Sequence, residues 1–393
     1  MAVRSVFPGL NPLLLAAFIG TMAMMAFVAV IGPVVRLLGL AEWHAGLSVT
    51  AAGVLWVATA RRWGALSDRI GRRRVLLIGM AGYALVYIGM AVFVDAALAR
   101  PPAVALSVVC LVGARALVGL FYAAVPPAAA ALIADEVPAG GRGAVMAALG
   151  TANALGMVVG PAVVGWIAFR SLALALYMAA VLPLLALALL WWRLPVRALP
   201  QVPDSAAPRL GWLDARLRLP LLAVFVAMVS VTIAQVTVGF FAIDRLQLAP
   251  AAGARAAGLA LTAVGLSLIV AQVLVMKLAR VSPRQWIALG ALLSALGFAS
   301  VTLVAVQWQL LLAYAAGAFG MGFVFPSFQA LAADSVSAPE QGAAAGTVAA
   351  VQGLGIVVGP LLGTVLYRVS DSLPYLFVAG ALALLSVAAL RHR

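Results

Sequence analysis

Twelve long apolar runs, separated by short polar turns, are the feature that most constrains the fold of this 393-residue chain. A helix needs about 20 apolar residues to cross a bilayer, and backbone groups in hydrocarbon need internal partners, so the spans must be helices or a closed barrel. Barrel strands alternate apolar and polar residues, whereas runs such as Leu172–Trp192 do not alternate. The sequence therefore predicts an all-α membrane protein with twelve transmembrane helices.

Composition supports the same class, because 66% of the residues are hydrophobic and only 9% are charged, against about 25% charged residues in soluble domains. The predicted spans fall into two sets of six, joined by a proline- and arginine-rich stretch that reads as an irregular linker. We predict an N-terminal six-helix bundle over 1–192, a linker over 193–218 and a C-terminal six-helix bundle over 219–393. The spans are 12–35, 45–63, 74–94, 102–124, 143–168, 171–192, 219–242, 256–277, 285–306, 309–331, 342–367 and 373–390.

The two halves are copies of one another. Residues 131–161 and 330–360 align without a gap, and the alignment pairs Asp135 with Asp334, Gly156 with Gly355, and Pro161 with Pro360. An apolar bias alone would align alanines and valines, but not an acid, a proline and several glycines together. Such a parallel repeat is typical of transporters built from two similar halves.

The net charge of +14 is better explained by membrane topology than by nucleic-acid binding. Most of the 25 Lys and Arg fall on one side of the predicted membrane, and this bias places both termini in the cytoplasm. The single cysteine, Cys110, excludes an intrachain disulfide or a cysteine metal cluster. The preference for arginine over lysine suggests a GC-rich bacterial gene, and hence a multi-pass protein of the bacterial inner membrane. We expect a monomer.

A compact polar turn lies between the second and third spans. Its residues Gly64, Asp68, Arg69, Gly71, Arg72 and Arg73 are spaced as Gly, three residues, Asp-Arg, one residue, Gly-Arg-Arg. This pattern resembles the signature loop between helices 2 and 3 of the major facilitator superfamily of transporters. The resemblance implies a conformational-switch loop, in which Asp68 caps a neighbouring helix or pairs with Arg142 in the next cytoplasmic loop.

Arg115 lies midway along the fourth span, with no acidic residue in that helix. A charge at the bilayer centre is costly, and such a residue faces protein or water and usually has a function. With Gly119 and Tyr122 on the same helical face, Arg115 resembles a helix 4 motif that is associated with proton coupling in antiporters, although Val118 replaces its usual Gln. The alternative is an arginine that bonds backbone carbonyls and fixes the position of the helix.

The stretch with Gly156, Gly160, Pro161 and Gly165 resembles a helix 5 motif of the antiporter subfamilies. Glycines four residues apart allow close helix approach, and the proline permits a kink. Ordinary small-residue packing is the alternative explanation. The motif is the main reason to expect export rather than import.

None of the 11 acidic residues is predicted to lie in the middle of a span. The candidates for the proton carrier are therefore Arg115, Asp135, Glu136, Asp244 and His44. Without a buried carboxylate, Arg115 favours a neutral or anionic substrate. In this fold the cavity is implied to lie between helices 1, 4, 7 and 10. The matching spans supply Met25, Arg115, Tyr122, Gln235, Tyr314, Phe319 and Phe323.

These features predict proton-coupled export of a small amphipathic molecule, such as a drug-like compound or a siderophore, by alternating access. A metabolite importer or uncoupled facilitator of the same superfamily is the alternative. A membrane-embedded enzyme would need clustered His or acids within spans, and the only two His, His44 and His392, lie far apart in the sequence. We expect no cofactor and no metal; the partners are the small-molecule substrate, protons and the lipid bilayer, with no nucleic acid.

Overall fold

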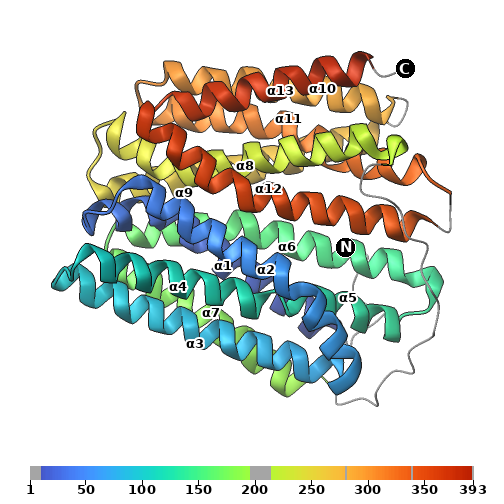
Figure 1. Cartoon of the computed structure of the whole chain (residues 1–393), viewed down its shortest axis with the longest axis horizontal. Coiled ribbons are helices and arrows are strands. Elements are labelled where there is room, and N and C mark those ends of the chain that lie inside the picture. The colour runs from blue at the N-terminus through green and yellow to red at the C-terminus, as the bar shows by residue number, and fades with distance from the viewer. Residues whose placement is uncertain (1–9, 195–213, 279–280, 338–339, 392–393) are drawn as a thin grey trace. The chain divides into compact units, whose positions relative to one another are not determined.

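The computed structural model is almost entirely helical (Figure 1) and describes residues 10–194, 214–278, 281–337 and 340–391. The predicted spans correspond to long helices. Most of the predicted linker, 195–213, lies outside the described residues.

The first half contains α1 (Asn11–Leu37), α2 (Glu42–Ile70), α3 (Arg72–Ala99), α4 (Val104–Tyr122), α5 (Val125–Glu136), α6 (Ala139–Ala168) and α7 (Leu172–Arg193). The second half contains η2 (Ala215–Leu217), α8 (Arg218–Asp244), α9 (Pro250–Lys277), α10 (Pro283–Ser300), η3 (Val301–Leu303), α11 (Gln307–Asp334), α12 (Gln341–Val369) and α13 (Leu373–Arg391). Most helix ends lie within about five residues of the predicted ones, but α2 ends later than predicted, α9 begins earlier, α10 ends earlier, and the fourth span differs most.

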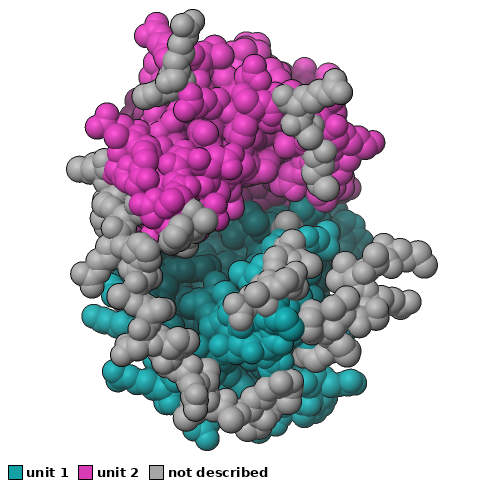
Figure 2. Space-filling view, turned by 90° about the vertical axis from the view of Figure 1, so that its right-hand side faces the viewer, with its two compact units in different colours: residues 1–40, 51–203 teal, residues 41–50, 204–393 magenta. Residues whose placement is uncertain are grey.

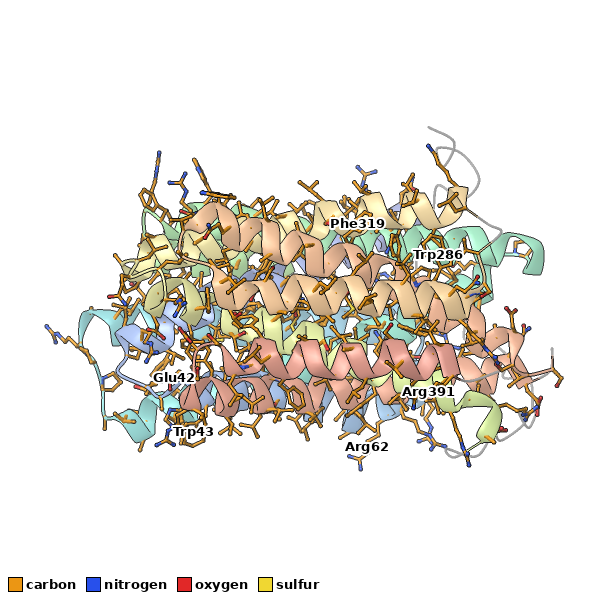
Figure 3. The ribbon with its side chains drawn as sticks, turned by 90° about the horizontal axis from the view of Figure 1, so that it is seen from above. Glu42, Trp43, Arg62, Trp286, Phe319 and Arg391 are labelled. Atoms are coloured by element: carbon orange, nitrogen blue, oxygen red, sulfur yellow. The ribbon has the colours of Figure 1, made fainter. Side chains whose placement is uncertain are left out.

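Within the described ranges, 11 segments are long and apolar enough to cross a membrane. The predicted span 45–63 lies in α2, which is 29 residues long and is not among these 11. Its sequence explains the difference, since the polar residues His44, Ser48 and Thr50 lie in its first half and the charged residues Arg61 and Arg62 in its second. Figure 3 labels Trp43 and Arg62, which lie far apart along this helix.

The fourth span is longer than predicted and is broken in the middle. Helix α4 ends at Tyr122 and α5 begins at Val125, and the two together form one candidate span over Val104–Glu136. Pro126 and Pro127 follow the break directly. Proline lacks the amide hydrogen that a continuing helix needs but fits its first turn, so one helix ends here and another begins.

The chain divides into two compact units, residues 1–40 with 51–203, and residues 41–50 with 204–393, which Figure 2 colours separately. In unit 1, α1 packs against α6 and α7, and α3 packs against α4 and α7. In unit 2, α8 packs against α12 and α13, while α10 packs against α11 and α13. Residues 41–50, in the first turns of α2, group with unit 2, where Thr50 Oγ1 donates a hydrogen bond to the carbonyl of Val357 at 2.7 Å.

The repeat predicted from the sequence has a counterpart in the packing inside each unit. A Cβ on Gly156 of α6 would lie 2.5 Å from the carbonyl oxygen of Phe18 in α1. A Cβ on Gly355 of α12 would lie 3.3 Å from the carbonyl oxygen of Phe225 in α8 and 2.5 Å from Met228 Cβ. Because glycine has no side chain, the two backbones approach closely at these positions. Both units therefore use an aligned glycine to bring the same pair of helices together.

Candidate functional site

Arg115 is buried in the middle of unit 1, with only 1% of its surface exposed. Its guanidinium carbon lies 4.4 Å from the centre of the Phe27 ring, and its Nη1 lies 3.9 Å from the sulfur of Met24. Its Nε is buried without a hydrogen-bond partner. Within the described residues no carboxylate forms an ion pair with Arg115, so the charge is offset only by a ring face, a thioether and nearby hydroxyl groups.

Two buried tyrosines of α3 supply those hydroxyl groups and anchor α3 to α1. The Tyr83 hydroxyl donates to the carbonyl of Gly20 at 3.3 Å, and the Tyr87 hydroxyl donates to the carbonyl of Ala23 at 3.0 Å. Both tyrosines, like Arg115, are fully buried inside unit 1. Since their protons are held by α1 carbonyls, their oxygens can turn lone pairs toward the cation.

A second polar cluster lies on the same face of α1, one turn before Met24. Thr21 Oγ1 donates to Asn153 Oδ1 at 2.9 Å and lies 3.0 Å from the Tyr122 hydroxyl. A threonine has only one hydroxyl proton, and Asn153 receives it, so Tyr122 must donate to Thr21. Tyr122 was predicted from the sequence to line the cavity, but Thr21 was not, because one threonine in an apolar helix carries no distinguishing pattern.

The predicted switch loop forms an ion network at one end of unit 1. Arg72 pairs with Asp68 and also donates from Nε to Asp135 Oδ2 at 3.0 Å and from Nη1 to Ser67 Oγ at 2.7 Å. Gly71 joins α2 to α3 with φ +95°, a backbone conformation that favours glycine. Asp135 thereby belongs to this network. The side chain of Arg142, the predicted partner of Asp68, lies outside the described side chains.

Arg73 ties the same loop to the end of α7. It donates to the carbonyl of Leu194 at 2.6 Å and to that of Trp191 at 2.7 Å, and its guanidinium lies over the Trp191 ring. The last carbonyls of a helix lack partners within the helix and carry partial negative charge, so a cation there is favourable. Arg69 is exposed, and a Cβ on Gly64 would make only ordinary contact with Pro127.

The predicted helix 5 motif lies in α6, where it packs against α1. A Cβ on Gly160 would lie 2.3 Å from the carbonyl oxygen of Met22. Pro161 lies within α6, which continues past it to Ala168, and Gly165 is buried. The glycines of this motif therefore allow α6 to pack closely against α1. The equivalent glycines of α12 allow the same close packing against α8 in unit 2.

The remaining predicted cavity residues differ in their exposure. Met25 in unit 1, and Gln235 and Phe319 in unit 2, are partly buried. Tyr314 and Phe323 are buried inside unit 2. The Tyr314 hydroxyl lies 2.9 Å from the carbonyl oxygen of Ala234 and 2.9 Å from the Tyr375 hydroxyl.

Phe323 and Phe319 form an aromatic cluster with Trp286 within unit 2. The Phe323 ring lies 4.7 Å from the Trp286 ring and 4.9 Å from the Phe319 ring. Figure 3 shows Trp286 and Phe319 on neighbouring helices. Such ring pairs stabilise helix packing, so we assign Phe323 a packing role in this conformation. Phe319 is only partly buried and so remains partly accessible.

The other candidate proton carriers also have partners. Asp244 Oδ2 accepts a hydrogen bond from the Tyr367 hydroxyl at 3.0 Å, and His44 Nδ1 accepts one from the backbone amide of Ala41 at 3.1 Å. Both lie at helix ends. In the described part of the chain, no group of three or more His, Cys, Asp or Glu is arranged to hold a metal ion.

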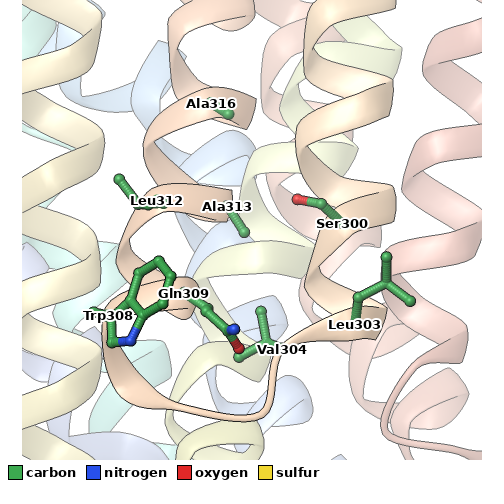
Figure 4. A pocket seen from close by; sticks show the side chains of 8 residues that line it. All are labelled: Ser300, Leu303, Val304, Trp308, Gln309, Leu312, Ala313 and Ala316. Atoms are coloured by element: carbon green, nitrogen blue, oxygen red, sulfur yellow. The ribbon is translucent and has the colours of Figure 1, made fainter.

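A shallow pocket of about 350 Å³ lies where α10, η3 and α11 meet in unit 2 (Figure 4). Leu303, Trp308 and Leu312 line it and are largely exposed, and Ser300 and Gln309 supply its polar groups. The pocket contains none of the predicted site residues. A tryptophan beside an apolar groove at the end of a helix is typical of a membrane interface.

Comparison with known proteins places these features in a family. The model of the Major Facilitator Superfamily matches residues 13–254 and 221–393. The chain is 30% identical over 344 residues to the tetracycline resistance protein, class G, of Vibrio anguillarum, which covers 82% of this chain and 80% of that protein. It is 38% identical over 152 residues to the multidrug efflux pump LfrA of Mycolicibacterium smegmatis, covering 38% and 26% of the two chains.

A gallate transporter of Pseudomonas putida is 32% identical over 155 residues, which covers 38% of this chain and 31% of that protein. Among solved structures, that of the peptide transporter POT in complex with sulfate matches with a TM-score of 0.77 at 17% identity, covering 98% of this chain and 95% of the other. At that identity, the structural match speaks for the fold alone.

Proposed function

The chain belongs to the Major Facilitator Superfamily, and from that premise we propose that it exports a small amphipathic molecule by proton-coupled alternating access. In this proposal α2 also crosses the membrane, which brings the number of spans to twelve, and two six-helix bundles rock about a central site. The protein is a monomer in a bacterial inner membrane, with both termini in the cytoplasm. Two relatives named for resistance or efflux support the direction of transport, as does the α6 motif.

The observation that carries the proposal is the buried guanidinium of Arg115 without a carboxylate partner. An uncompensated buried charge costs several kcal/mol, and a cation–π contact returns about 2 kcal/mol. A chain that retains such a charge gains most if a ligand supplies the missing anion. We propose that the cargo carries a negative group, such as a carboxylate, that pairs with Arg115 once the flexible Met24 side chain moves aside.

The ion network of Asp68, Arg72 and Asp135 is our candidate for the conformational switch. It links the end of α2, the start of α3 and the end of α5 on what we propose is the cytoplasmic side. Protonation of Asp135 would remove one of the two charges that hold Arg72. This gives a physical route by which a proton entering from one side weakens the network, and it makes Asp135 a coupling candidate beside Arg115.

A metabolite importer or an uncoupled facilitator is the second candidate function. The observation in its favour is the relative named as a gallate transporter, because gallate is an aromatic carboxylate of the kind that Arg115 would pair with. The dependence of transport on a proton gradient separates coupled from uncoupled transport: collapsing the gradient with a protonophore abolishes the former and leaves the latter running downhill.

The proposal is tested by comparing the small molecules in the medium and in the cells of cultures that express either wild type or Arg115→Ala at matched membrane abundance. We expect at least one anionic compound to be enriched outside wild-type cells and retained inside variant cells. Accumulation inside wild-type cells would instead establish import. Identical profiles for the wild type, the variant and an empty vector would overturn export of a cell metabolite.

A further inference from the structure

Among the described residues, unit 2 has no counterpart of the Thr21–Asn153 hydrogen bond, although the helix packing around it is repeated there. The repeat pairs Gly156 with Gly355 and therefore Asn153 with Gln352, while the matching contacts of α1 and α8 pair Thr21 with Met228. Methionine offers no hydroxyl group. In unit 2 the hydroxyl that reaches across to α12 is that of Thr232, which donates to the backbone carbonyl of Gly355 at 3.4 Å. Since α8 and α12 pack closely without a side-chain amide bond among the described residues, the Asn153 amide is not required by the packing.

The direction of the hydrogen bonds decides what this cluster offers to a ligand. Tyr122 donates to Thr21, and Thr21 donates to Asn153 Oδ1. The amide oxygen is thus occupied, and the two protons of Asn153 Nδ2 have no partner among the described residues. Asn153 and Thr21 are only partly buried, so these two protons remain available to an acceptor.

Arg115 lies farther along α1. Thr21 precedes Met24 by three residues and Phe27 by six, and these are the two α1 residues that the guanidinium contacts. At a rise of 1.5 Å per residue, the amide and the guanidinium are separated along α1 by about 5–9 Å. The ring of Tyr122, which bonds Thr21, lies 5.1 Å from that of Tyr83, and the Met24 sulfur lies against Arg115. The two sets of donors are therefore separated by apolar groups.

We infer that Asn153 is a second cargo-binding residue, which donates to a hydrogen-bond acceptor on a molecule whose carboxylate pairs with Arg115. Thr21 is a positioning residue that holds the Asn153 amide with its protons free. The cargo class is then a flat or apolar molecule with a carboxylate at one end and a carbonyl or similar acceptor about one benzene ring away. This inference rests on the proposed function and adds the recognition of the cargo's second end.

The test uses two benzoates of nearly equal shape, 4-acetylbenzoate and 4-isopropylbenzoate, which differ in one carbonyl acceptor. Binding of each to the purified full-length protein in lipid nanodiscs is measured by titration calorimetry. We expect the wild type to bind the acetyl compound about three- to tenfold more tightly, as one hydrogen bond contributes. Asn153→Leu brings the ratio close to one, and Thr21→Val lowers it while both compounds still bind.

Gln352→Leu is the matched control, because it removes an amide at the equivalent position of unit 2, and it keeps the wild-type ratio. Equal binding of the two benzoates by the wild type, or no binding of either, would overturn the inference. So would a ratio that survives Asn153→Leu. None of these results decides the outcome of the export experiment with Arg115→Ala. Export that depends on Arg115 and cargo binding by Asn153 can therefore fail separately.

Discussion

The guanidinium of Arg115 lies 4.4 Å from the centre of the Phe27 ring, and this contact joins α4 to α1 inside unit 1. The ring face is a weak partner for a cation that is 1% exposed. The relationship therefore raises a question of stability as well as function. An arginine that fixes the helix position should stabilise the protein, whereas one kept for a ligand should destabilise it until the ligand arrives.

Replacing the charge separates these two roles. We predict that Arg115→Met raises the unfolding temperature of the ligand-free protein by a few degrees, because apolar replacements of buried charged groups are often stabilising by about 1–4 kcal/mol. The same variant loses transport. The measurement is thermal unfolding in detergent beside a transport assay. A lower unfolding temperature would assign Arg115 a structural role.

Loss of one carboxylate from the ion network of Asp68, Arg72 and Asp135 is expected to affect transport and to leave the stability of the protein almost unchanged. Asp68→Asn removes one of the two carboxylates that hold Arg72 and should abolish transport, while the amount of protein in the membrane stays at the wild-type level. Surface ion pairs contribute little to stability, so the effect should be on transport rate. Arg62→Gln, which neutralises an exposed charge near the same loop, serves as the control and keeps transport. Normal transport by Asp68→Asn would exclude the switch role.

Close packing of α6 on α1 predicts a steric effect at Gly156. A Cβ there would lie 2.5 Å from the Phe18 carbonyl oxygen, whereas a Cβ on Gly150 of the same helix would meet nothing within 4 Å. Gly156→Val should therefore lower the free energy of unfolding by about 1–3 kcal/mol, as expected for overpacking, and Gly150→Ala should not. Denaturant unfolding of the two variants provides the comparison, and equal stabilities would contradict the close approach.

The end of the linker is held to unit 2 by a pH-sensitive ion pair. Arg216 donates to both carboxylate oxygens of Glu340, at 3.0 and 3.1 Å, and to Asp214. The hydrogen bonds from Arg216, aided by Ser337, lower the pKa of Glu340 from its usual value near 4.5 to about 2. A lowered pKa in the folded state means that the pair stabilises the protein above about pH 4.5 and loses this contribution as the pH falls toward about 2.

We therefore predict that Glu340→Gln is less stable than the wild type at about pH 7, and that the difference shrinks at about pH 3. Thermal unfolding of both proteins at the two pH values measures it. The effect is small, because the groups are partly exposed and salt screens them. A stability difference that does not change with pH would show that the carboxylate charge of Glu340 does not contribute.

Much of the helical architecture was predictable, because span length and hydropathy follow directly from the bilayer. The break between Tyr122 and Val125 was missed, although Pro126 and Pro127 were visible signals for it. The prediction that Arg115 faces protein or water rather than lipid agrees with its burial inside unit 1. Its contacts with Met24 and Phe27, and the Thr21–Asn153 bond, join residues far apart in sequence with no spacing pattern, so only the packed structure reveals them.

The Asp68–Arg72–Asp135 network could be predicted only in part. The loop motif identified Asp68 and Arg72, and Asp135 was one of several open candidates for the proton carrier. Their direct link depends on where α5 ends relative to α3, which a sequence without an alignment does not specify. The sequence instead suggested that Asp68 caps a neighbouring helix or pairs with Arg142 in the next cytoplasmic loop.

The central claim, that Arg115 binds the negative charge of the cargo, is tested most directly by binding of gallate and of its neutral methyl ester to the purified protein in nanodiscs. The account predicts that the wild type binds gallate at least tenfold more tightly than the ester, and that Arg115→Met binds both equally weakly. If the wild type binds the ester as tightly as the anion, or if Arg115→Met binds gallate like the wild type, Arg115 does not bind the cargo's charge.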